Sequence, residues 1–358
     1  MKALIAMSGG VDSSVAAWLM KNKGYECIGA TMRLFDNEEA GISCDRTCCS
    51  LDDAEDARYV CNNVGIRHYV FNFRADFRKQ VIDRFIHCYE EGGTPNPCID
   101  CNRFLKFDRL YERAKLLDCD VIVTGHYAQI ERRGTRWILK KAVDESKDQS
   151  YVLYTMTQDQ LAHTQFPLGG LHKTQTREIA ERQGFINAKK HDSQDICFVP
   201  DGDYSAAIRR FTGKEYPPGD FVDVQGNVLG SHKGIISYTI GQRKGLGLAL
   251  PAPMYVLEKN VRENKVVLGK NEDLFRRELE AEDFNWIAYE EPPAELHVKA
   301  RIRYNQKEQA AVVTPVGKDR VHLMFDEPQR AITPGQAVVI YDPENMNVIG
   351  GGIIRQGE

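Results

Sequence analysis

The seven-residue segment SGGVDSS, at Ser8–Ser14, constrains the fold more than any other stretch of the chain. The preceding segment, Lys2–Met7, is apolar and is typical of a short strand. The following segment, Val15–Lys23, has apolar residues at helical spacing and ends at Gly24. The loop therefore joins the end of a strand to the start of a helix. Its two glycines let a ligand approach main-chain amides, and these amides, with the positive end of the helix, can cradle phosphate oxygens.

The side chains of this loop add to that interpretation. Ser8, Ser13 and Ser14 can donate hydroxyl hydrogen bonds. Asp12 would repel an anion unless a cation bridges the two, so we expect Asp12 to contact magnesium. A Walker A loop carries a lysine that reaches the outer phosphates, but this loop is shorter and has none. An ordinary strand–helix turn is the plain alternative, although such a turn needs neither the aspartate nor three serines.

Composition places the chain among globular proteins. Its 358 residues suffice for two or three domains, and 42% are hydrophobic and 27% charged. No stretch approaches the roughly 20 apolar residues that span a bilayer, and the apolar start is too short for a signal peptide. We therefore expect a cytoplasmic protein with no membrane contact. The net charge of −4 is uneven, since residues 209–277 hold 12 Lys and Arg against 7 Asp and Glu. That excess suits either a phosphate backbone or a solvated face.

All ten cysteines lie at or before Cys197. In the cytoplasm, clustered cysteines serve catalysis or metal binding more often than disulfides. Cys98 and Cys101 form a CxxC motif where a loop meets a helix, a placement that lowers the pKa of a thiol. Three further cysteines have a spacing that permits metal binding, but no histidine pattern accompanies them, and a structural or incidental role is favoured: Cys44, Cys48 and Cys49.

The order of predicted elements indicates three domains. Strands alternate with helices as far as residue 203, which predicts a parallel sheet with ligands at the carboxyl ends of its strands. Met32 and Gly125-His126 each follow such an end. Residues 204–278 are glycine-rich and predict a small β-rich domain with a basic loop, Thr239–Gly247, that can contact phosphates. Residues 279–358 alternate apolar and polar positions between turns and predict an antiparallel barrel. The predicted fold is thus α/β, a parallel-sheet nucleotide-binding domain followed by two β domains.

The SGGVDSS loop resembles that of the PP-loop ATP pyrophosphatases. This resemblance implies cleavage of ATP between the α- and β-phosphates, leaving AMP on a substrate oxygen. Combined with separated reactive cysteines, it suggests that sulfur replaces an activated oxygen. A carbonyl oxygen is a poor leaving group. Once AMP is attached to it, the oxygen belongs to a phosphate ester and departs readily with AMP. A persulfide on one cysteine can then deliver sulfur, and a second cysteine can resolve the product as a disulfide.

Further motifs follow in order along nearly the whole chain, and together they resemble those of the bacterial tRNA-specific 2-thiouridylases. The resemblance implies ATP-dependent thiolation at carbon-2 of the wobble uridine in the tRNAs for Lys, Glu and Gln. It implies ATP and Mg²⁺ as cosubstrates and a sulfur-relay protein or cysteine desulfurase as sulfur donor. The oligomeric state stays open, with a monomer favoured. The motifs are Ser8–Ser14, Thr94-Pro95-Asn96-Pro97 with Cys101-Asn102, Gly125-His126, Lys147–Ser150, Ile196-Cys197-Phe198, Thr239–Gly247 and Thr333-Pro334-Gly335-Gln336.

The same resemblance implies a role for individual residues. Cys101 would be the nucleophile and Cys197 the persulfide carrier. The residues that would bind ATP are Ala6, Met7, Ser8, Gly9, Gly10, Val11, Asp12, Ser13, Met32 and Gly125. Those that would meet the target base are Asn96, Pro97 and Cys98. Those that would contact tRNA are His126, Lys147, Asp148, Gln149, Arg303, Tyr304 and Gln336.

One departure from the family leaves alternatives open. Many members have aspartate where this chain has Cys98. With Cys101 and Cys197 it makes three thiolates, which could hold an iron–sulfur cluster with one iron open to sulfide. Persulfide relay is favoured over cluster chemistry. An ATP-dependent amidating ligase would explain the SGGVDSS loop but leave the cysteines and the basic segment unused. A nucleotide-sensing or RNA-binding module would use the loop only to hold ATP.

Overall fold

The computed structural model describes residues 1–36, 51–192 and 196–356, so Cys44, Cys48 and Cys49 lie outside the described residues. The chain divides into two compact units. Within the described ranges, no helix combines the length and apolar character needed to cross a membrane. Unit 1 comprises Met1–Ile82, Pro97–Asp203 and Met346–Ile349, and unit 2 comprises Asp83–Asn96, Tyr204–Asn345 and Gly350–Glu358.

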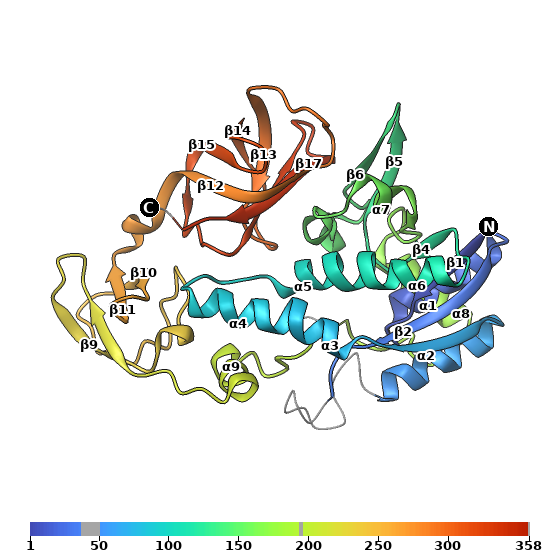
Figure 1. Cartoon of the computed structure of the whole chain (residues 1–358), viewed down its shortest axis with the longest axis horizontal. Coiled ribbons are helices and arrows are strands. Elements are labelled where there is room, and N and C mark those ends of the chain that lie inside the picture. The colour runs from blue at the N-terminus through green and yellow to red at the C-terminus, as the bar shows by residue number, and fades with distance from the viewer. Residues whose placement is uncertain (37–50, 193–195, 357–358) are drawn as a thin grey trace. The chain divides into compact units, whose positions relative to one another are not determined.

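Unit 1 is built on a parallel sheet of five strands in the order β3-β2-β1-β4-β7 (Figure 1). β1 pairs in parallel with both β2 and β4, so the chain fills one side of β1 first and the other side later. The carboxyl ends of β1 and β4 mark the point where the strand order reverses, and ligands bind at such points in open α/β sheets. The strands are β1 (Lys2–Ala6), β2 (Glu26–Arg33), β3 (Arg67–Asn72), β4 (Val121–Val123) and β7 (Thr164–Gln165).

The central strand β1 is apolar from Ala3 to Ala6 because both of its faces are covered. Ala3, Leu4 and Ile5 are fully buried. Ala3 and Ile5 share a core with apolar residues of three helices. These helices are α1 (Val11–Asn22), α2 (Leu51–Val64) and α8 (Lys173–Arg182).

In the described chain, two helical segments are interrupted by π-helical turns. The first consists of α3 (Arg74–Phe77), π-helical η1 (Arg78–Ile82) and α4 (Asp83–Glu90). The second consists of α5 (Pro97–Asp100), π-helical η2 (Cys101–Arg109) and α6 (Leu110–Leu116). Wide turns of this kind are frequent at functional sites, and η2 begins at one of the candidate cysteines.

Several short elements complete unit 1. A hairpin of β5 (Gln129–Arg133) and β6 (Arg136–Lys140) was not predicted from the sequence. The start of β17 pairs with β6, which explains why Met346–Ile349 belongs to this unit. The remaining elements are η3 (Glu145–Lys147), η4 (Ser150–Leu153) and α7 (Gln158–Ala162).

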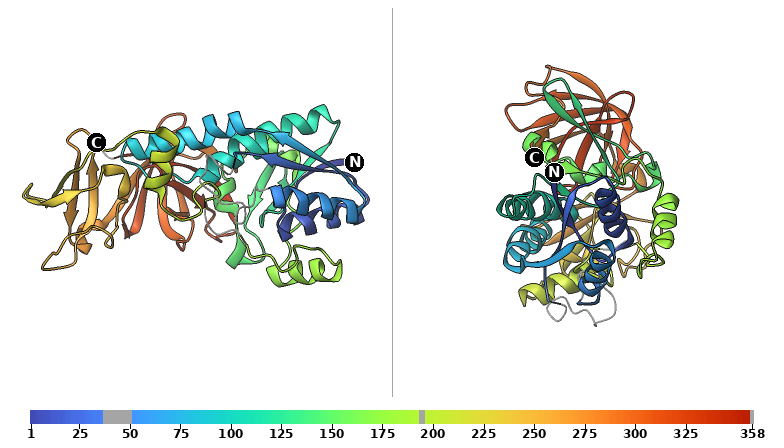
Figure 2. Two further views of the ribbon diagram at one scale, coloured as in Figure 1. Left: turned by 90° about the horizontal axis from the view of Figure 1, so that it is seen from below. Right: turned by 90° about the vertical axis from the view of Figure 1, so that its right-hand side faces the viewer.

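Unit 2 contains a four-stranded sheet in the order β10-β11-β8-β9 and a barrel in the order β12-β15-β14-β13-β16-β17. The barrel strands, orange to red in Figures 1 and 2, are antiparallel, and pairing of β12 with β17 closes the barrel. Val298 and Ala300 of β13 point inward, as the alternation predicts. The predicted fold class is confirmed. The unit contains α9 (Tyr204–Thr212), β8 (Gly219–Val222), β9 (Val228–His232), η5 (Ile235–Ser237), β10 (Tyr255–Asn260), β11 (Lys265–Gly269), η6 (Asn271–Leu274), β12 (Phe275–Trp286), β13 (Leu296–Arg301), β14 (Gln309–Pro315), β15 (Val321–Arg330), β16 (Ala337–Tyr341) and β17 (Asn347–Ile354).

Candidate active site

The Ser8–Ser14 loop follows the carboxyl end of β1 and opens α1. Gly9 has a φ of +75°, and a Cβ atom there would lie 2.4 Å from the carbonyl oxygen of Asp53. The hydroxyls of Ser13 and Ser14 donate to the Gly10 carbonyl at 2.9 and 3.0 Å. The N-cap residue, Gly10, has no side chain that could cap α1. The first backbone amides of α1 can therefore donate to an anion. The geometry suits the predicted phosphate cradle at Ala6, Met7, Ser8, Gly9, Gly10, Val11 and Ser13.

A buried asparagine far along the chain fixes this loop. Asn187 Nδ2 donates to the Gly9 carbonyl and to Ser14 Oγ, both at 2.9 Å. Asn187 is 3% exposed. Its two bonds tie the glycine turn to the first turn of α1. Sequence reasoning did not find Asn187, because nothing in its local sequence marks it.

Asp12 is held by a cation and a phenol. Lys173 Nζ lies 2.8 Å from each carboxylate oxygen of Asp12, and the Tyr127 hydroxyl donates to Oδ1 at 2.9 Å. Among the described residues, no three His, Cys, Asp or Glu side chains gather into a metal site. Asp12 supplies one carboxylate, so Mg²⁺ would need further oxygen ligands from phosphates and water, which is how Mg²⁺ usually binds with a nucleotide.

Lys173 also bridges Asp12 to a second carboxylate, Asp192, at 2.7 Å. Asp192 accepts further from Lys147 Nζ at 2.8 Å and from Arg177 at 3.1 Å. Burial alone would raise the pKa of Asp192, but hydrogen bonds from Lys147 and Lys173 outweigh burial and hold that pKa below its ordinary value. Three cations therefore surround one ionised carboxylate beside the phosphate cradle. Lys147 was predicted to contact tRNA, and that role stays a prediction.

The end of β4 meets the loop at Gly125. A Cβ atom on Gly125 would lie 2.8 Å from the Asp12 carbonyl carbon, so only glycine permits this approach. His126, the next residue, is 7% exposed, and its Nδ1 lies 2.6 Å from Thr124 Oγ1. Burial and the nearby Lys106 ammonium hold the pKa of His126 well below its ordinary value. The imidazole is therefore neutral at pH 7, and its predicted contact with tRNA stays a prediction.

The neighbouring predicted tRNA contacts organise their own loop. Asp148 is buried and accepts from the Ala142 amide at 3.0 Å and from the Ser150 hydroxyl at 2.8 Å. Gln149 Oε1 accepts from the Tyr127 amide at 3.0 Å. These bonds fix the backbone that follows Lys147.

Met32, which was predicted to bind ATP, lies on the opposite side of β1. It is half-buried on β2, where it pairs with β3.

The three candidate cysteines lie in unit 1 at different depths. Cys98 is exposed on α5, and Cys101, at the start of η2, and Cys197 are half-buried. Phe198, next to Cys197, packs edge-on against Phe77 of α3 at 5.8 Å between ring centroids. Because α3 also packs against η2, the turn of Cys197 and the helix of Cys101 contact the same element. The three thiols form no three-ligand metal site in the described chain.

Asn102, which follows Cys101, anchors the start of η2. Its Nδ2 donates to the Val152 carbonyl in η4 at 2.9 Å, and the residue is 2% exposed. Its Oδ1 is buried and has no hydrogen-bond partner among the described residues. This bond ties the start of η2, where Cys101 lies, to η4.

Asn96 and three of the residues predicted to contact tRNA lie in unit 2, whereas Pro97 begins α5 in unit 1. Gln336 Nε2 donates to the Thr94 carbonyl at 2.8 Å, two residues before Asn96. Arg303 donates to Thr333 Oγ1 at 3.2 Å and also to the Ala331 carbonyl. Tyr304 is 38% exposed. Arg303 and Gln336 therefore brace two loops of this unit.

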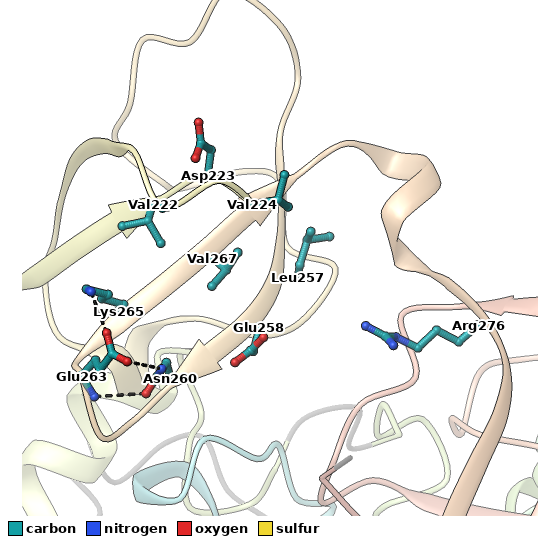
Figure 3. Close-up of a pocket in the computed structure, with 11 residues that line it drawn as sticks. Val222, Asp223, Val224, Leu257, Glu258, Asn260, Glu263, Lys265, Val267 and Arg276 are labelled. Carbon is teal, nitrogen blue, oxygen red and sulfur yellow. Dashed lines mark hydrogen bonds and ion pairs between the residues drawn. The ribbon is translucent and has the colours of Figure 1, made fainter. Parts of the chain in front are cut away.

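A pocket of about 420 Å³ lies on the four-stranded sheet of unit 2 (Figure 3). Val222, Leu257 and Val267 form its apolar wall, and Glu263 on the rim pairs with Lys265 at 2.6 Å. None of the residues predicted to bind ATP, the target base or tRNA lines this pocket. It is therefore separate from the candidate active site.

Comparisons with known proteins agree with this arrangement. Residues 1–201 match the tRNA methyl transferase HUP domain, residues 206–270 the tRNA methyl transferase PRC-barrel domain, and residues 276–354 the aminomethyltransferase β-barrel domain. The tRNA-specific 2-thiouridylase MnmA of Clostridioides difficile (strain 630) is 50% identical over 357 residues, covering 99% of this chain and 98% of that protein. The protein of the same name from Clostridium beijerinckii is 49% identical over 354 residues, with 99% and 98% covered.

Among solved structures, a 4-thiouridine synthetase–RNA complex with bound ATP is 21% identical, with a TM-score of 0.37. The match covers 56% of this chain and 45% of that one. A likeness this weak carries no argument.

Proposed function

The chain belongs to the tRNA-specific 2-thiouridylase family, and we propose that it is a tRNA sulfurtransferase that replaces oxygen by sulfur at carbon-2 of the wobble uridine. Its substrates would be the tRNAs for Lys, Glu and Gln, with ATP and Mg²⁺ as cosubstrates. The observation that carries the proposal is that unit 1 holds both the SGGVDSS loop and the candidate cysteines. A phosphate cradle at the sheet's reversal point shares a compact unit with Cys101 and Cys197.

In the first step, uridine O2 attacks the α-phosphorus of ATP and pyrophosphate leaves. The amides at the start of α1, with Ser8 and Ser13, hold the phosphates. Lys173 neutralises charge on the leaving pyrophosphate, as fixed cations do in phosphoryl and nucleotidyl transfer. Asp12 is the residue that would hold Mg²⁺, and the ion would supply Lewis-acid stabilisation of the phosphate oxygens. The product is an adenylated uridine whose O2 can depart as part of AMP.

In the second step, the terminal sulfur of a Cys197 persulfide attacks carbon-2 and the carbon–oxygen bond breaks, releasing AMP. The Cys101 thiolate then attacks the sulfur of Cys197, which breaks the sulfur–sulfur bond and leaves the terminal sulfur on the base. The two cysteines form a disulfide, and a thiol reductant restores both. The persulfide comes from a sulfur-relay protein or cysteine desulfurase. Asn96, Pro97 and Cys98 meet the target base in this scheme.

The test is thiolation by purified protein. The reaction contains Mg-ATP, a cysteine desulfurase with cysteine, and unmodified tRNA for Glu, and nucleoside mass spectrometry detects 2-thiouridine. Wild-type protein should form it, whereas Cys101→Ala and Cys197→Ala should not. Cys119→Ala is the matched control, since Cys119 is buried and its pKa is raised by burial. No 2-thiouridine from wild-type protein, with AMP release stimulated by a small amine acceptor, would favour an amidating ligase.

A further inference from the structure

The segment that leads to the target-base residues, loop 92–96, is held by two parts of unit 2. Lys259 of β10 donates to the Gly93 carbonyl at 3.1 Å. The Thr94 amide donates to the Pro334 carbonyl at 2.8 Å, and the Thr94 carbonyl accepts from Gln336 Nε2 at 2.8 Å. The four-stranded sheet and the barrel thus each bond directly to adjacent residues of one loop.

Loop 92–96 and the segment around Gly335 both lie so close to Cys88 that only glycine fits at the points of contact. Cβ atoms on Gly93 and Gly335 would lie 2.6 and 2.5 Å from the same atom, Cys88 Sγ. Cys88 belongs to α4, which precedes the loop. The loop therefore has little room to shift while its hydrogen bonds are intact.

Burial of the Lys259 ammonium costs free energy. The side chain of Lys259 is 2% exposed, and its ammonium donates to two backbone carbonyls, those of Gly93 and Tyr238 at 3.1 and 3.0 Å. The ring of Tyr89 lies 5.5 Å away. Burial lowers the pKa of Lys259 to about 8, which shows how poorly this position solvates a charge. An apolar side chain would serve packing at lower cost, so the ammonium calls for a role other than stability.

We propose that Lys259 and Gln336 are positioning residues for thiolation, holding loop 92–96 so that the Asn96-Pro97-Cys98 segment presents correctly to the target uridine. The inference rests on the proposed function. Asn96 is both the last residue of the loop and the first of the three predicted target-base residues. A displacement of the loop therefore moves Asn96 directly, and through it Pro97. Misplacement of about 1 Å at a reacting centre costs on the order of a hundredfold in rate. Loss of either hydrogen bond should therefore reduce turnover more than tRNA binding.

The test uses full-length Lys259→Met, which keeps the volume and removes the donors, and Gln336→Leu, which changes a half-buried residue and creates no buried charge. Lys265→Met on β11 is the control, since Lys265 pairs with Glu263 outside this network. We measure kcat and KM for tRNA, hydrogen exchange of peptides covering loop 92–96, and the thermal midpoint. Lys259→Met and Gln336→Leu should both show a fall in kcat of about tenfold or more and faster exchange in the loop. KM should be nearly unchanged for Lys259→Met, whereas Gln336→Leu also removes a predicted tRNA contact and should raise KM as well. The double variant should be no worse than the more impaired single one.

An unchanged kcat in both variants, or a rise in KM alone, would overturn the inference. If Lys259→Met fails to fold, Gln336→Leu decides it. Wild-type protein that forms no 2-thiouridine would refute the proposed function itself, whereas active wild-type protein with unimpaired variants would refute only the positioning role.

Discussion

Lys173 Nζ lies 2.8 Å from both carboxylate oxygens of Asp12, although the two residues are 161 positions apart. The SGGVDSS loop has no lysine of its own, and this contact brings one to it from the start of α8. Lys173 is 8% exposed and also pairs with Asp192. A fixed, partly desolvated cation beside a phosphate cradle is suited to stabilising charge that develops on a leaving pyrophosphate.

Lys173→Met should therefore slow pyrophosphate release in the presence of tRNA by on the order of a hundredfold. The comparison is Lys21→Met, which removes an exposed lysine from the far end of α1. Pyrophosphate release, followed by a coupled assay at saturating ATP and tRNA, should be normal in that control. Equal rates for Lys173→Met and wild-type protein would show that Lys173 serves the fold alone.

Gly9→Ala should destabilise the protein and impair ATP binding. The new Cβ would meet the Asp53 carbonyl, and the backbone has a positive φ. We expect a loss of about 2 kcal/mol in the free energy of unfolding by urea. Gly24→Ala is a matched control, because Gly24 has a φ of +84° but nothing within 4 Å of its Cβ position. The Gly24→Ala variant has the backbone strain without the steric clash. Its free energy of unfolding should therefore fall by less, and calorimetry should show normal ATP binding. Similar losses in both variants would contradict the steric argument.

The sequence was sufficient to predict the elements with strong local patterns. The strand before the SGGVDSS loop, the helix after it and the alternating barrel strands follow from apolar periodicity and turn residues. The hairpin β5–β6 was missed because its burial depends on pairing with β17, more than 200 residues later. The partners of the loop were missed for the same reason. Asn187, Lys173 and Tyr127 act through contacts made by the folded chain, and no local motif marks them.

His126 should contribute to acid sensitivity. The folded protein holds this imidazole neutral, whereas in the unfolded chain it takes up a proton below a pKa of about 6.5. Protonation therefore favours unfolding, and stability falls as the pH drops below that value, by up to about 1.4 kcal/mol for each pH unit from this group. Urea midpoints between pH 7.5 and 5.5, a window of about 1 pH unit on either side of that pKa, should fall less steeply for His126→Gln than for wild-type protein. Parallel slopes would show that the pKa of His126 is the same in the folded and the unfolded chain.

The persulfide and cluster alternatives make different demands on Cys98. No three-ligand set forms among the described residues, so we expect protein purified without oxygen to lack stoichiometric iron and acid-labile sulfide. Cys98→Ala should then still form 2-thiouridine with a persulfide donor, at a rate lowered by the loss of its predicted contact with the target base, whereas Cys101→Ala should form none. Near-stoichiometric iron that disappears in each of the Cys98, Cys101 and Cys197 variants would instead establish a cluster-dependent enzyme.

The most direct test of the account follows the fate of one oxygen atom. A tRNA for Glu is prepared with a heavy-oxygen label at O2 of the wobble uridine and is incubated with the protein, Mg-ATP and a sulfur donor. If adenylation of O2 precedes sulfur transfer, the label appears in the phosphate of AMP, one atom for each 2-thiouridine formed, as measured by mass spectrometry. Label released to water, with unlabelled AMP, would contradict activation of the base by ATP.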